Sequence, residues 1–269
     1  MSGLTLTLKA PPAIRLNMAA VTPARLSDLT ERDIAAINLG SQRTPVALGD
    51  AFAIRMGDAR DIRIVGATER LDHVAWALSG GALTVEGHVG AYLAVQMTGG
   101  AVVVKGSAGP WAGAGMTDGS VEIGGDAGES AGGALPGASS GMRGGLIVVR
   151  GGAGARAGDR MRRGLIVIEG KAGAHLGARM IAGTAVALGG AGAYPGYLMR
   201  RGSVILGADA EEIGPSFADC GRHDFTMLRL MARRLALVSP AFAGRAAPAA
   251  RRYAGDMATL GKGEILLLG

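Results

Sequence analysis

The chain has 269 residues, of which 47 are glycine, while 48% are hydrophobic and only 4% are aromatic. Such a composition supplies a core but is unlike that of an ordinary α/β enzyme, because it favours backbone freedom over bulky side chains. The single cysteine, Cys220, excludes an intrachain disulfide framework and any cysteine-based metal or iron–sulfur site within this chain.

The positive charge is concentrated in the second half of the chain. Residues 1–141 contain 10 Lys+Arg and 13 Asp+Glu, a net charge of −3, whereas residues 142–269 contain 18 and 9, a net charge of +9. A basic half indicates an acidic partner, such as nucleic acid, a membrane surface or an anionic cofactor. The N-terminus lacks a signal-peptide pattern and the apolar runs are too short to span a bilayer, so we expect a cytoplasmic protein.

Residues 1–77 form a mixed α/β lead-in. The alternating stretch LTLTLKA (4–10) predicts a strand. The stretch SDLTERDIAAINLG (27–40) predicts a short helix, capped by Thr30 or Ser27 and ended by Gly40. DIRIVG (61–66) predicts another strand.

Residues 78–208 are a repeat of 19 residues with one seven-residue insert at 134–140. Glycine recurs three, nine, twelve and sixteen positions after nearly every start, so the pattern is not an accident of composition. The starts are Leu78, Met97, Met116, Met142, Met161, Met180 and Met199.

Each unit also carries a β-branched pair two residues apart, as in Val102/Val104 and Ile166/Ile168. That spacing places both side chains on one face of a strand. The sixth unit has Ala185 and Ala187 there, which we interpret as a slip caused by a local bulge. A short repeat with inward β-branched pairs and turn glycines predicts a mainly β protein, a parallel right-handed β-helix of six to seven coils. We expect the glycines where φ is positive or where neighbouring coils crowd out a Cβ.

Residues 209–269 form the third part. Phe225, Leu228 and Leu235 lie at helical spacing in 223–238, which predicts a helix. Because solenoids need capping, we expect this helix to cover an open end of the rod. The stretch EILLLG (264–269) predicts a final strand.

The sequence contains no convincing catalytic motif. GGAGARAG (151–158) and GDMATLGKG (255–263) fail the spacing of nucleotide-binding loops, and no serine lies in a G-x-S-x-G turn. We expect the four histidines, His73, His88, His175 and His223, to be exposed or half-buried rather than metal ligands. Cys220 and His223 allow either a nucleophile–base pair or a free cysteine packed under the C-terminal helix, which is the favoured interpretation.

Several arginines fall at or beside the unit starts, so stacking should gather them along one edge of the rod. Like charges about 4.8 Å apart repel, so the edge is either solvated or neutralised by a partner. Three interpretations stay open: a solubilising face, a docking edge for an acidic subunit, and a track for a polyanion. The edge has no aromatics, which disfavours nucleic acid. The arginines are Arg143, Arg160, Arg162, Arg163, Arg179, Arg200 and Arg201.

The methionine-to-methionine repeat, the insert after the third coil and the closing PSFADCG (215–221) and FTMLRLMARRL (225–235) resemble the C subunit of formylmethanofuran dehydrogenase, and most closely its bacterial form, the C subunit of the formyltransferase/hydrolase complex of methylotrophs. LTLK, SDLTERDIAAINLG and LGDAFAI extend the resemblance over nearly the whole chain. The coil motif alone is also similar to the C-terminal domain of the glutamate synthase large subunit.

The resemblance implies a parallel β-helix subunit without catalytic residues. Partner subunits, an amidohydrolase-like A with zinc-like metal ions, B and a formyltransferase D, would convert formyl-tetrahydromethanopterin to formate through a methanofuran-type (methylofuran) cofactor in one-carbon (formaldehyde oxidation) metabolism. We expect two copies of this chain in a hetero-octamer. Because such cofactors carry glutamyl chains, we expect the seven arginines to bind the polyglutamate tether.

Other identities stay open. One is the C subunit of a tungsten or molybdenum formylmethanofuran dehydrogenase, and another is a glutamate synthase-like β-helix domain. A free-standing β-helix binding module is a third. Such a module would display a flat array of threonines or aromatic rings, and we expect no such array here.

Overall fold

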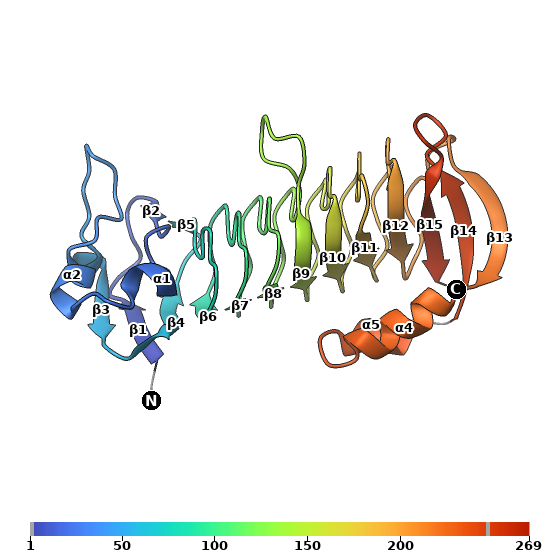
Figure 1. The fold of residues 1–269 in the computed structure, drawn as a ribbon. Helices are drawn as coiled ribbons and strands as arrows, with labels where there is room; N and C mark the ends of the chain where they lie inside the picture. The colour runs from blue at the N-terminus through green and yellow to red at the C-terminus, as the bar shows by residue number, and fades with distance from the viewer. Residues whose placement is uncertain (1–2, 246–247, 269) are drawn as a thin grey trace.

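The computed structural model describes residues 3–245 and 248–268. Within them, thirteen strands form one large, mostly parallel sheet that runs the length of an elongated molecule (Figure 1). One strand comes from each repeat unit, and strands consecutive in sequence are neighbours in space. They are β6 (Ala82–Gly87), β7 (Ala101–Val104), β8 (Ser120–Ile123), β9 (Arg143–Val149), β10 (Arg163–Ile168), β11 (Thr184–Ala187) and β12 (Arg201–Leu206).

The units stack in register. Val102 lies opposite Val121, which in turn lies opposite Ile147 across the seven-residue insert. A second line of parallel bridges joins the units away from the sheet, running from Val89 through Ala108 and onward to Ala210. Each unit therefore bonds to the next at two places. The β-branched pairs form a buried inner column, as the repeat predicts.

The repeat glycines serve both purposes expected of them. At Gly119 φ is +94°, and an added Cβ would lie 2.8 Å from the carbonyl oxygen of Gly100. At Gly109 an added Cβ would lie 2.7 Å from the carbonyl carbon of Gly90 in the preceding unit. Gly119 has a left-handed backbone, and both Gly119 and Gly109 lie where neighbouring units approach closely. Larger residues at these positions would push the stack apart.

The sixth unit does not slip, so the interpretation of a local bulge is wrong. Ala185 lies opposite both Ile166 and Val204, and Ala187 opposite Ile168, with no break in register. Both alanines are fully buried in the inner column, while Val186 points to the other side of the sheet. The unit simply places small residues inside and a larger one outside.

The lead-in matches the sequence prediction and extends the same sheet. It contains β1 (Gly3–Leu8), β2 (Leu16–Asn17), α1 (Pro23–Leu26), α2 (Glu31–Ala35), α3 (Leu48–Ala51), β3 (Phe52–Arg55), β4 (Asp58–Ala67) and β5 (Leu71–Asp72). Thr30 caps α2 and bonds reciprocally with Asp33, as predicted, but the C-cap is Ala36, so the expectation that Gly40 ends the helix is wrong. β4 of the lead-in pairs in parallel with β6, the first strand of the repeat, so one sheet crosses the predicted boundary at residue 77.

At the other end the chain forms β13 (Ala218–Asp224), α4 (Thr226–Leu235), α5 (Pro240–Arg245), β14 (Ala249–Gly255) and β15 (Lys262–Leu268). The expectation that the helix caps the open end of the rod is wrong. β15 continues the stack beside β12, and antiparallel β14 and β13 follow it, while α4 and α5 lie along the side of the sheet (Figure 1). The predicted strand at 264–269 is confirmed over its described residues.

An outer apolar column explains where the helices lie. Val148, Val167, Val186 and Ile205 project from the sheet on the side opposite the inner column and are buried against Leu228, Leu235 and Phe242 of the helices. The runs LIVV and LIVI are therefore apolar on both faces of the sheet, as in parallel sheets covered on both sides. A helix capping the end would leave this column in water.

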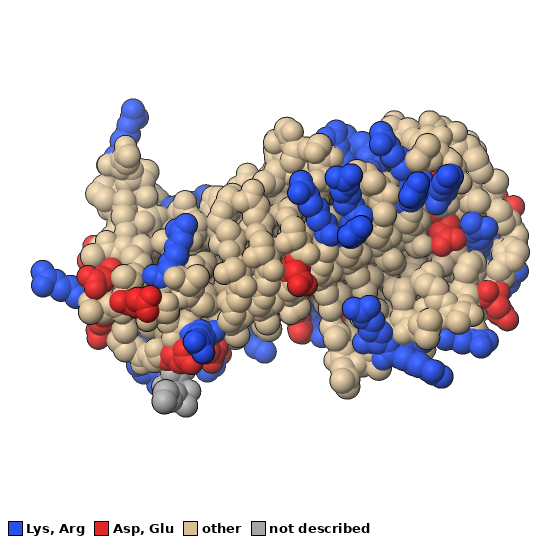
Figure 2. Space-filling view, in the orientation of Figure 1, with Lys and Arg blue, Asp and Glu red and all other residues tan. Residues whose placement is uncertain are grey.

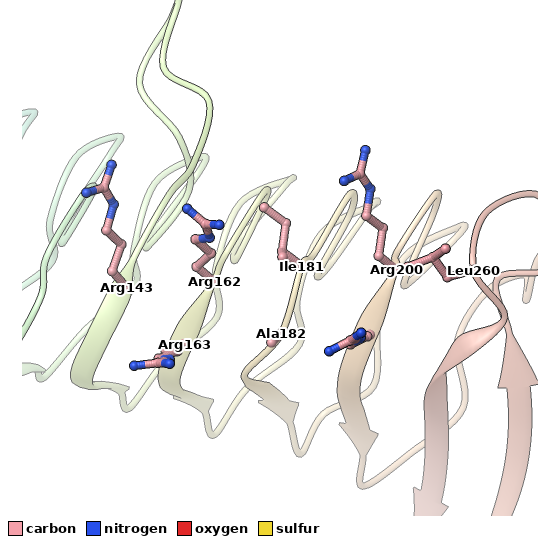
Figure 3. A pocket seen from close by; sticks show the side chains of 8 residues that line it. Arg143, Arg162, Arg163, Ile181, Ala182, Arg200 and Leu260 are labelled. Carbon is pink, nitrogen blue, oxygen red and sulfur yellow. The ribbon is translucent and has the colours of Figure 1, made fainter.

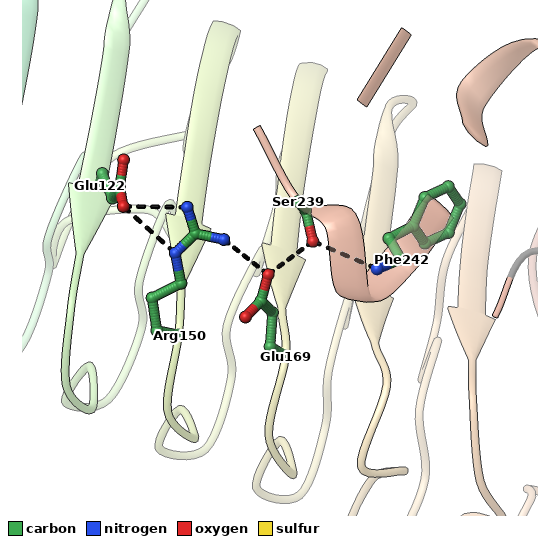
Figure 4. Close-up of polar contacts among 5 residues, drawn as sticks. All are labelled: Glu122, Arg150, Glu169, Ser239 and Phe242. Carbon is green, nitrogen blue, oxygen red and sulfur yellow. Dashed lines mark hydrogen bonds and ion pairs between the residues drawn. The ribbon is translucent and has the colours of Figure 1, made fainter. Parts of the chain in front are cut away.

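Polar contacts fix the junction between α4 and α5 to the sheet (Figure 4). The buried hydroxyl of Ser239 donates to Oε1 of Glu169 at 2.6 Å and accepts from the Phe242 N–H at 3.4 Å. Arg150 lies between two carboxylates, bonding Glu169 at 2.7 Å and Glu122 at 2.9 Å. The junction is thus tied to three successive strands.

The inner column makes a direct prediction about stability. Replacement of fully buried Ile166 with alanine should lower the free energy of unfolding by about 2–5 kcal/mol, because the cavity opens between Ile147 and Ala185 in a stack that cannot close up. Urea unfolding followed by circular dichroism measures the change. Leu165→Ala, at a half-buried position beside it, should cost less than half as much. Equal losses for the two variants would contradict the assignment of an inner column.

Candidate functional site

The candidate site is a basic cavity where three repeat strands begin. Arg143, Arg163 and Arg201 are the first residues of β9, β10 and β12, and Arg162 and Arg200 directly precede two of these strands. Arg163 lies opposite Arg143 at a register shift where the two strands begin, so their backbones lie side by side. The arginines lie one or two residues after a fully buried methionine of the unit start, which anchors the backbone while the arginines face solvent.

Five of the seven predicted arginines line one shallow cavity of about 510 Å³. In Figure 3, Arg143, Arg162 and Arg200 point the same way, and Arg163 forms part of a lower row. Ile181 and Ala182 take the equivalent places in the sixth unit, and Leu260 from the loop between β14 and β15 closes one end. The cavity thus has guanidinium groups at its rim and an apolar patch between them. The five arginines are Arg143, Arg162, Arg163, Arg200 and Arg201.

The charge of this cavity is not balanced from within. Among the described residues, none of the five arginines forms an ion pair, and one of them makes a side-chain hydrogen bond, from Nε of Arg143 to the hydroxyl of Ser140 at 3.1 Å. Neighbouring guanidinium groups repel by about 1 kcal/mol per pair in water. An anion with several carboxylates would remove that repulsion and gain bidentate hydrogen bonds.

Arg160 and Arg179 do not belong to this cavity, so the prediction of a seven-arginine edge is wrong at these two positions. Both have left-handed backbones, with φ of +54° and +52°, and neither lines the cavity. Arg179 binds the buried Asp159 through two hydrogen bonds of 2.8 and 2.6 Å, and this pairing raises the pKa of Arg179. Arg160 donates to the carbonyl of Ala138 at 2.9 Å and so holds the insert.

Sequence reasoning missed the residues that come from outside the repeat. Lys262 lies opposite Arg201 in the sheet and continues the basic row onto β15. Leu260 lines the cavity from the adjoining loop. Neither carries a periodic signal, because β15 joins the stack only after the excursion through α4 and α5.

A second groove opens beside the first. It has a volume of about 660 Å³ and lies between α4, through Met231 and Arg234, and the starts of β8–β10. Arg143 and Arg163 line both hollows, so the two are continuous, and Asp118 adds an acidic side chain to the lining of the second. Figure 2 shows basic side chains gathered over β9–β12 and, separately, over the helices.

Comparison with known proteins decides the family. A curated relative, the C subunit of the formyltransferase/hydrolase complex Fhc of Methylorubrum extorquens, is 43% identical over 89 residues, which are 33% of this chain and 34% of the relative. A crystal structure described as the formyltransferase/hydrolase complex (FhcABCD) from Methylorubrum extorquens in complex with methylofuran contains a chain that matches with a TM-score of 0.92 and 42% identity, over 98% of this chain and 99% of that one. The chain belongs to the C-subunit family of the formyltransferase/hydrolase complex. No protein-family model matches it.

This member of the C-subunit family does not pair its cysteine with a histidine base. Cys220 is exposed on β13 and not packed under the helix, so that expectation is wrong. The Nε2 atom of His223 lies 2.8 Å from the backbone carbonyl of Cys220, not from its thiol. Because a carbonyl oxygen only accepts, Nε2 donates its N–H in this contact, and the Cys220 thiol donates to the carbonyl of Ala218 instead of to the ring. In the described ranges no helix has the length and apolarity to cross a membrane.

The histidines are exposed or half-buried, as predicted, but two of them take part in ring stacks. His73 stacks on Tyr92 at 4.9 Å between ring centroids, and Tyr92 stacks on Trp111 at 5.4 Å. His175 stacks on Tyr194 at 6.0 Å. The expectation that no aromatic array is present is therefore wrong for this corner of the rod. In the described part of the chain no group of three or more His, Cys, Asp or Glu could hold a metal ion.

His73 predicts a stability that depends on pH. Burial lowers its pKa, with a smaller opposing effect from Asp72, and its Nδ1 atom is buried without a hydrogen-bond partner among the described residues. A histidine with a lowered folded pKa stabilises the fold above its unfolded pKa of about 6.5 and loses this contribution as pH falls through the folded value. Melting temperature should therefore fall between pH 7 and pH 5.

The variant His73→Phe should lose less melting temperature over that range than the parent protein, because it keeps the ring stack without a group to protonate. The control is His223→Gln at an exposed position, which should leave the pH slope unchanged. Differential scanning fluorimetry measures the melting temperature of the parent protein and both variants across the pH series. A slope that is the same in all three proteins would exclude His73 as its origin.

Proposed function

We propose that this chain is a non-catalytic structural subunit of a formyltransferase/hydrolase complex that converts formyl-tetrahydromethanopterin to formate through a methylofuran-type cofactor. The supporting relatives are the Methylorubrum extorquens C subunit and the matching chain of the complex crystallised with methylofuran. Identity of 42% over 98% of the chain supports the bacterial hydrolase complex over a tungsten or molybdenum dehydrogenase or a glutamate synthase-like domain.

Within that complex, we propose that the basic cavity binds the polyglutamate tether of the cofactor. Its arginines recur along the rod with the repeat, about 4.8 Å per unit, apart from the apolar interruption at Ile181 and Ala182. A polyglutamate tether presents carboxylates on short methylene stems, so it matches a basic rim around an apolar patch. We assign Arg143, Arg162, Arg163, Arg200 and Arg201 to hold or guide this tether while its formyl-bearing end moves between partner active sites.

The stacked units are, in this proposal, the coils of a right-handed parallel β-helix. The two lines of parallel pairing, one in the sheet and one through Ala108 and its equivalents, support a chain that winds once per unit. Right-handed crossovers are the rule between parallel strands. We keep the division into a lead-in (1–77), a repeat (78–208) and a C-terminal part (209–269), although one sheet runs through both boundaries.

The chemistry is assigned to partner subunits. The partners would be an amidohydrolase-like A with metal ions, a B subunit and a formyltransferase D, with two copies of each in a cytoplasmic hetero-octamer. In this proposal the metal ions belong to the amidohydrolase-like partner. This chain's own contribution is then to position subunits and to bind an anionic chain.

The tether assignment predicts loss of glutamate binding on charge reversal. In the assembled complex, Arg162→Glu with Arg163→Glu should weaken binding of a fluorescent glutamate oligomer at least tenfold at low salt, and should flatten the dependence of affinity on salt concentration. Fluorescence anisotropy across a salt series measures both. Formyl transfer should slow with the same salt dependence.

The control is Arg43→Glu with Arg156→Glu, which makes the same charge change at two exposed positions outside the cavity. It should leave oligomer affinity within about twofold of the parent. Equal losses in both variants would indicate non-specific charge attraction, and unchanged affinity in the double variant would reject the tether site. Dissociation of the double variant on gel filtration would instead assign these arginines to an interface between subunits.

A further inference from the structure

The outer face of α4 exposes apolar side chains that the fold of this chain does not cover. Leu228 and Leu235 point to the sheet and are buried, whereas Leu230 is 60% exposed and Leu237, just beyond the helix, is 96% exposed. The two exposed leucines lie about two helical turns apart, with Arg233 between them. We call Leu230, Arg233 and Leu237, with flanking Arg229 and Arg234, the α4 face.

The α4 face is strongly and one-sidedly charged. Residues 225–255 contain six arginines and no acidic residue, so this segment alone equals the formal net charge of +6 of the whole chain. Arg251 and Arg252 are paired with Asp219 and Glu264. In the described ranges none of the arginines of α4 forms an ion pair. Figure 2 shows basic side chains standing out over the helices.

The α4 face is also held rigidly. The outer apolar column packs against Leu228, Leu235 and Phe242, and Ser239 ties the end of the helical pair to Glu169. Arg245 adds a hydrogen bond of 2.9 Å to the carbonyl of Leu188. A helix fixed in this way loses little conformational freedom on binding, which favours recognition by insertion into a groove.

We propose that the α4 face docks into a groove on another protein subunit of the complex, with an apolar floor for Leu230 and Leu237 and an acidic rim for Arg229, Arg233 and Arg234. The identity of the partner rests on the proposed function; the chemistry of the groove rests on the exposed leucines and the uncompensated charge. This surface differs from the tether cavity, which none of these five residues lines.

A protein partner fits the surface better than a membrane. Helices that lie in a bilayer bury a continuous apolar face several turns long. The apolar side of α4 is already turned to the sheet, and only two leucines remain outside. Two apolar anchors ringed by arginines are the size of a protein–protein hot spot.

The test uses the assembled complex, purified through a tag on this chain after co-expression with its other subunits. In Leu230→Ser with Leu237→Ser, the protein concentration at half dissociation should rise at least tenfold, measured by analytical ultracentrifugation and native mass spectrometry over a dilution series. Ile14→Ser with Met56→Ser is the matched control, since these residues are 39% and 41% exposed on the lead-in, and should leave assembly unchanged. The melting temperature of each isolated chain reports on folding.

The outcomes separate this proposal from the tether site. Weakened assembly in the α4 variant, with glutamate-oligomer binding retained, supports docking. Unchanged assembly, or equal weakening in the control, overturns docking and leaves the tether site standing. Failure of the parent chain to retain the other subunits overturns both. Sedimentation with vesicles containing anionic lipid, lost in the α4 variant while assembly is unchanged, would assign the face to a membrane and overturn docking.

Discussion

The whole structure depends on one constraint: each 19-residue unit must supply the next with backbone partners on two sides and with side chains for a dry interior. The strand pairing and the bridge line through Ala108 and its equivalents meet the first requirement. The buried inner column meets the second. Because units approach within van der Waals contact at Gly109 and Gly119, the repeat cannot accept larger residues there without losing its hydrogen bonds. The unusual glycine content is therefore a direct consequence of stacking.

Stacking also determines the surface. Within the strands, a residue at a given place in one unit lies over the same place in the next, and a register shift where the strands begin brings Arg163 opposite Arg143. Arginines at the strand starts are thereby gathered around one cavity. The same rule makes an outer column from Val148, Val167, Val186 and Ile205, which must be covered. The chain covers it with its own C-terminal helices rather than with a partner. That arrangement leaves α4 beside the basic cavity and makes the two hollows continuous through Arg143 and Arg163.

Periodic features were predictable from the sequence and non-periodic features were not. The equal spacing of residues in successive units correctly predicted the sheet, the inner column and the five arginines that line the cavity. The spacing failed at Arg160 and Arg179, because offsets do not show which side chains are held by tertiary contacts, here with Ala138 and Asp159. It also failed for the C-terminal helix, where the sequence showed one apolar face but not which of two apolar surfaces it covers. Lys262 and Leu260 join the site through tertiary contact alone.

The interruption of the basic row at Ile181 and Ala182 argues for a ligand rather than for simple solubility. A surface selected only to stay hydrated would gain nothing from a half-buried isoleucine between guanidinium groups. An unbroken row of arginines would also repel itself more strongly, since every unit would add two charges about 4.8 Å from the last. A gap relieves that repulsion and gives methylene groups an apolar contact while carboxylates reach the arginines on either side. The proposed tether site therefore uses one set of residues both to limit repulsion in the free protein and to contact the carboxylates and methylene groups of a glutamyl chain.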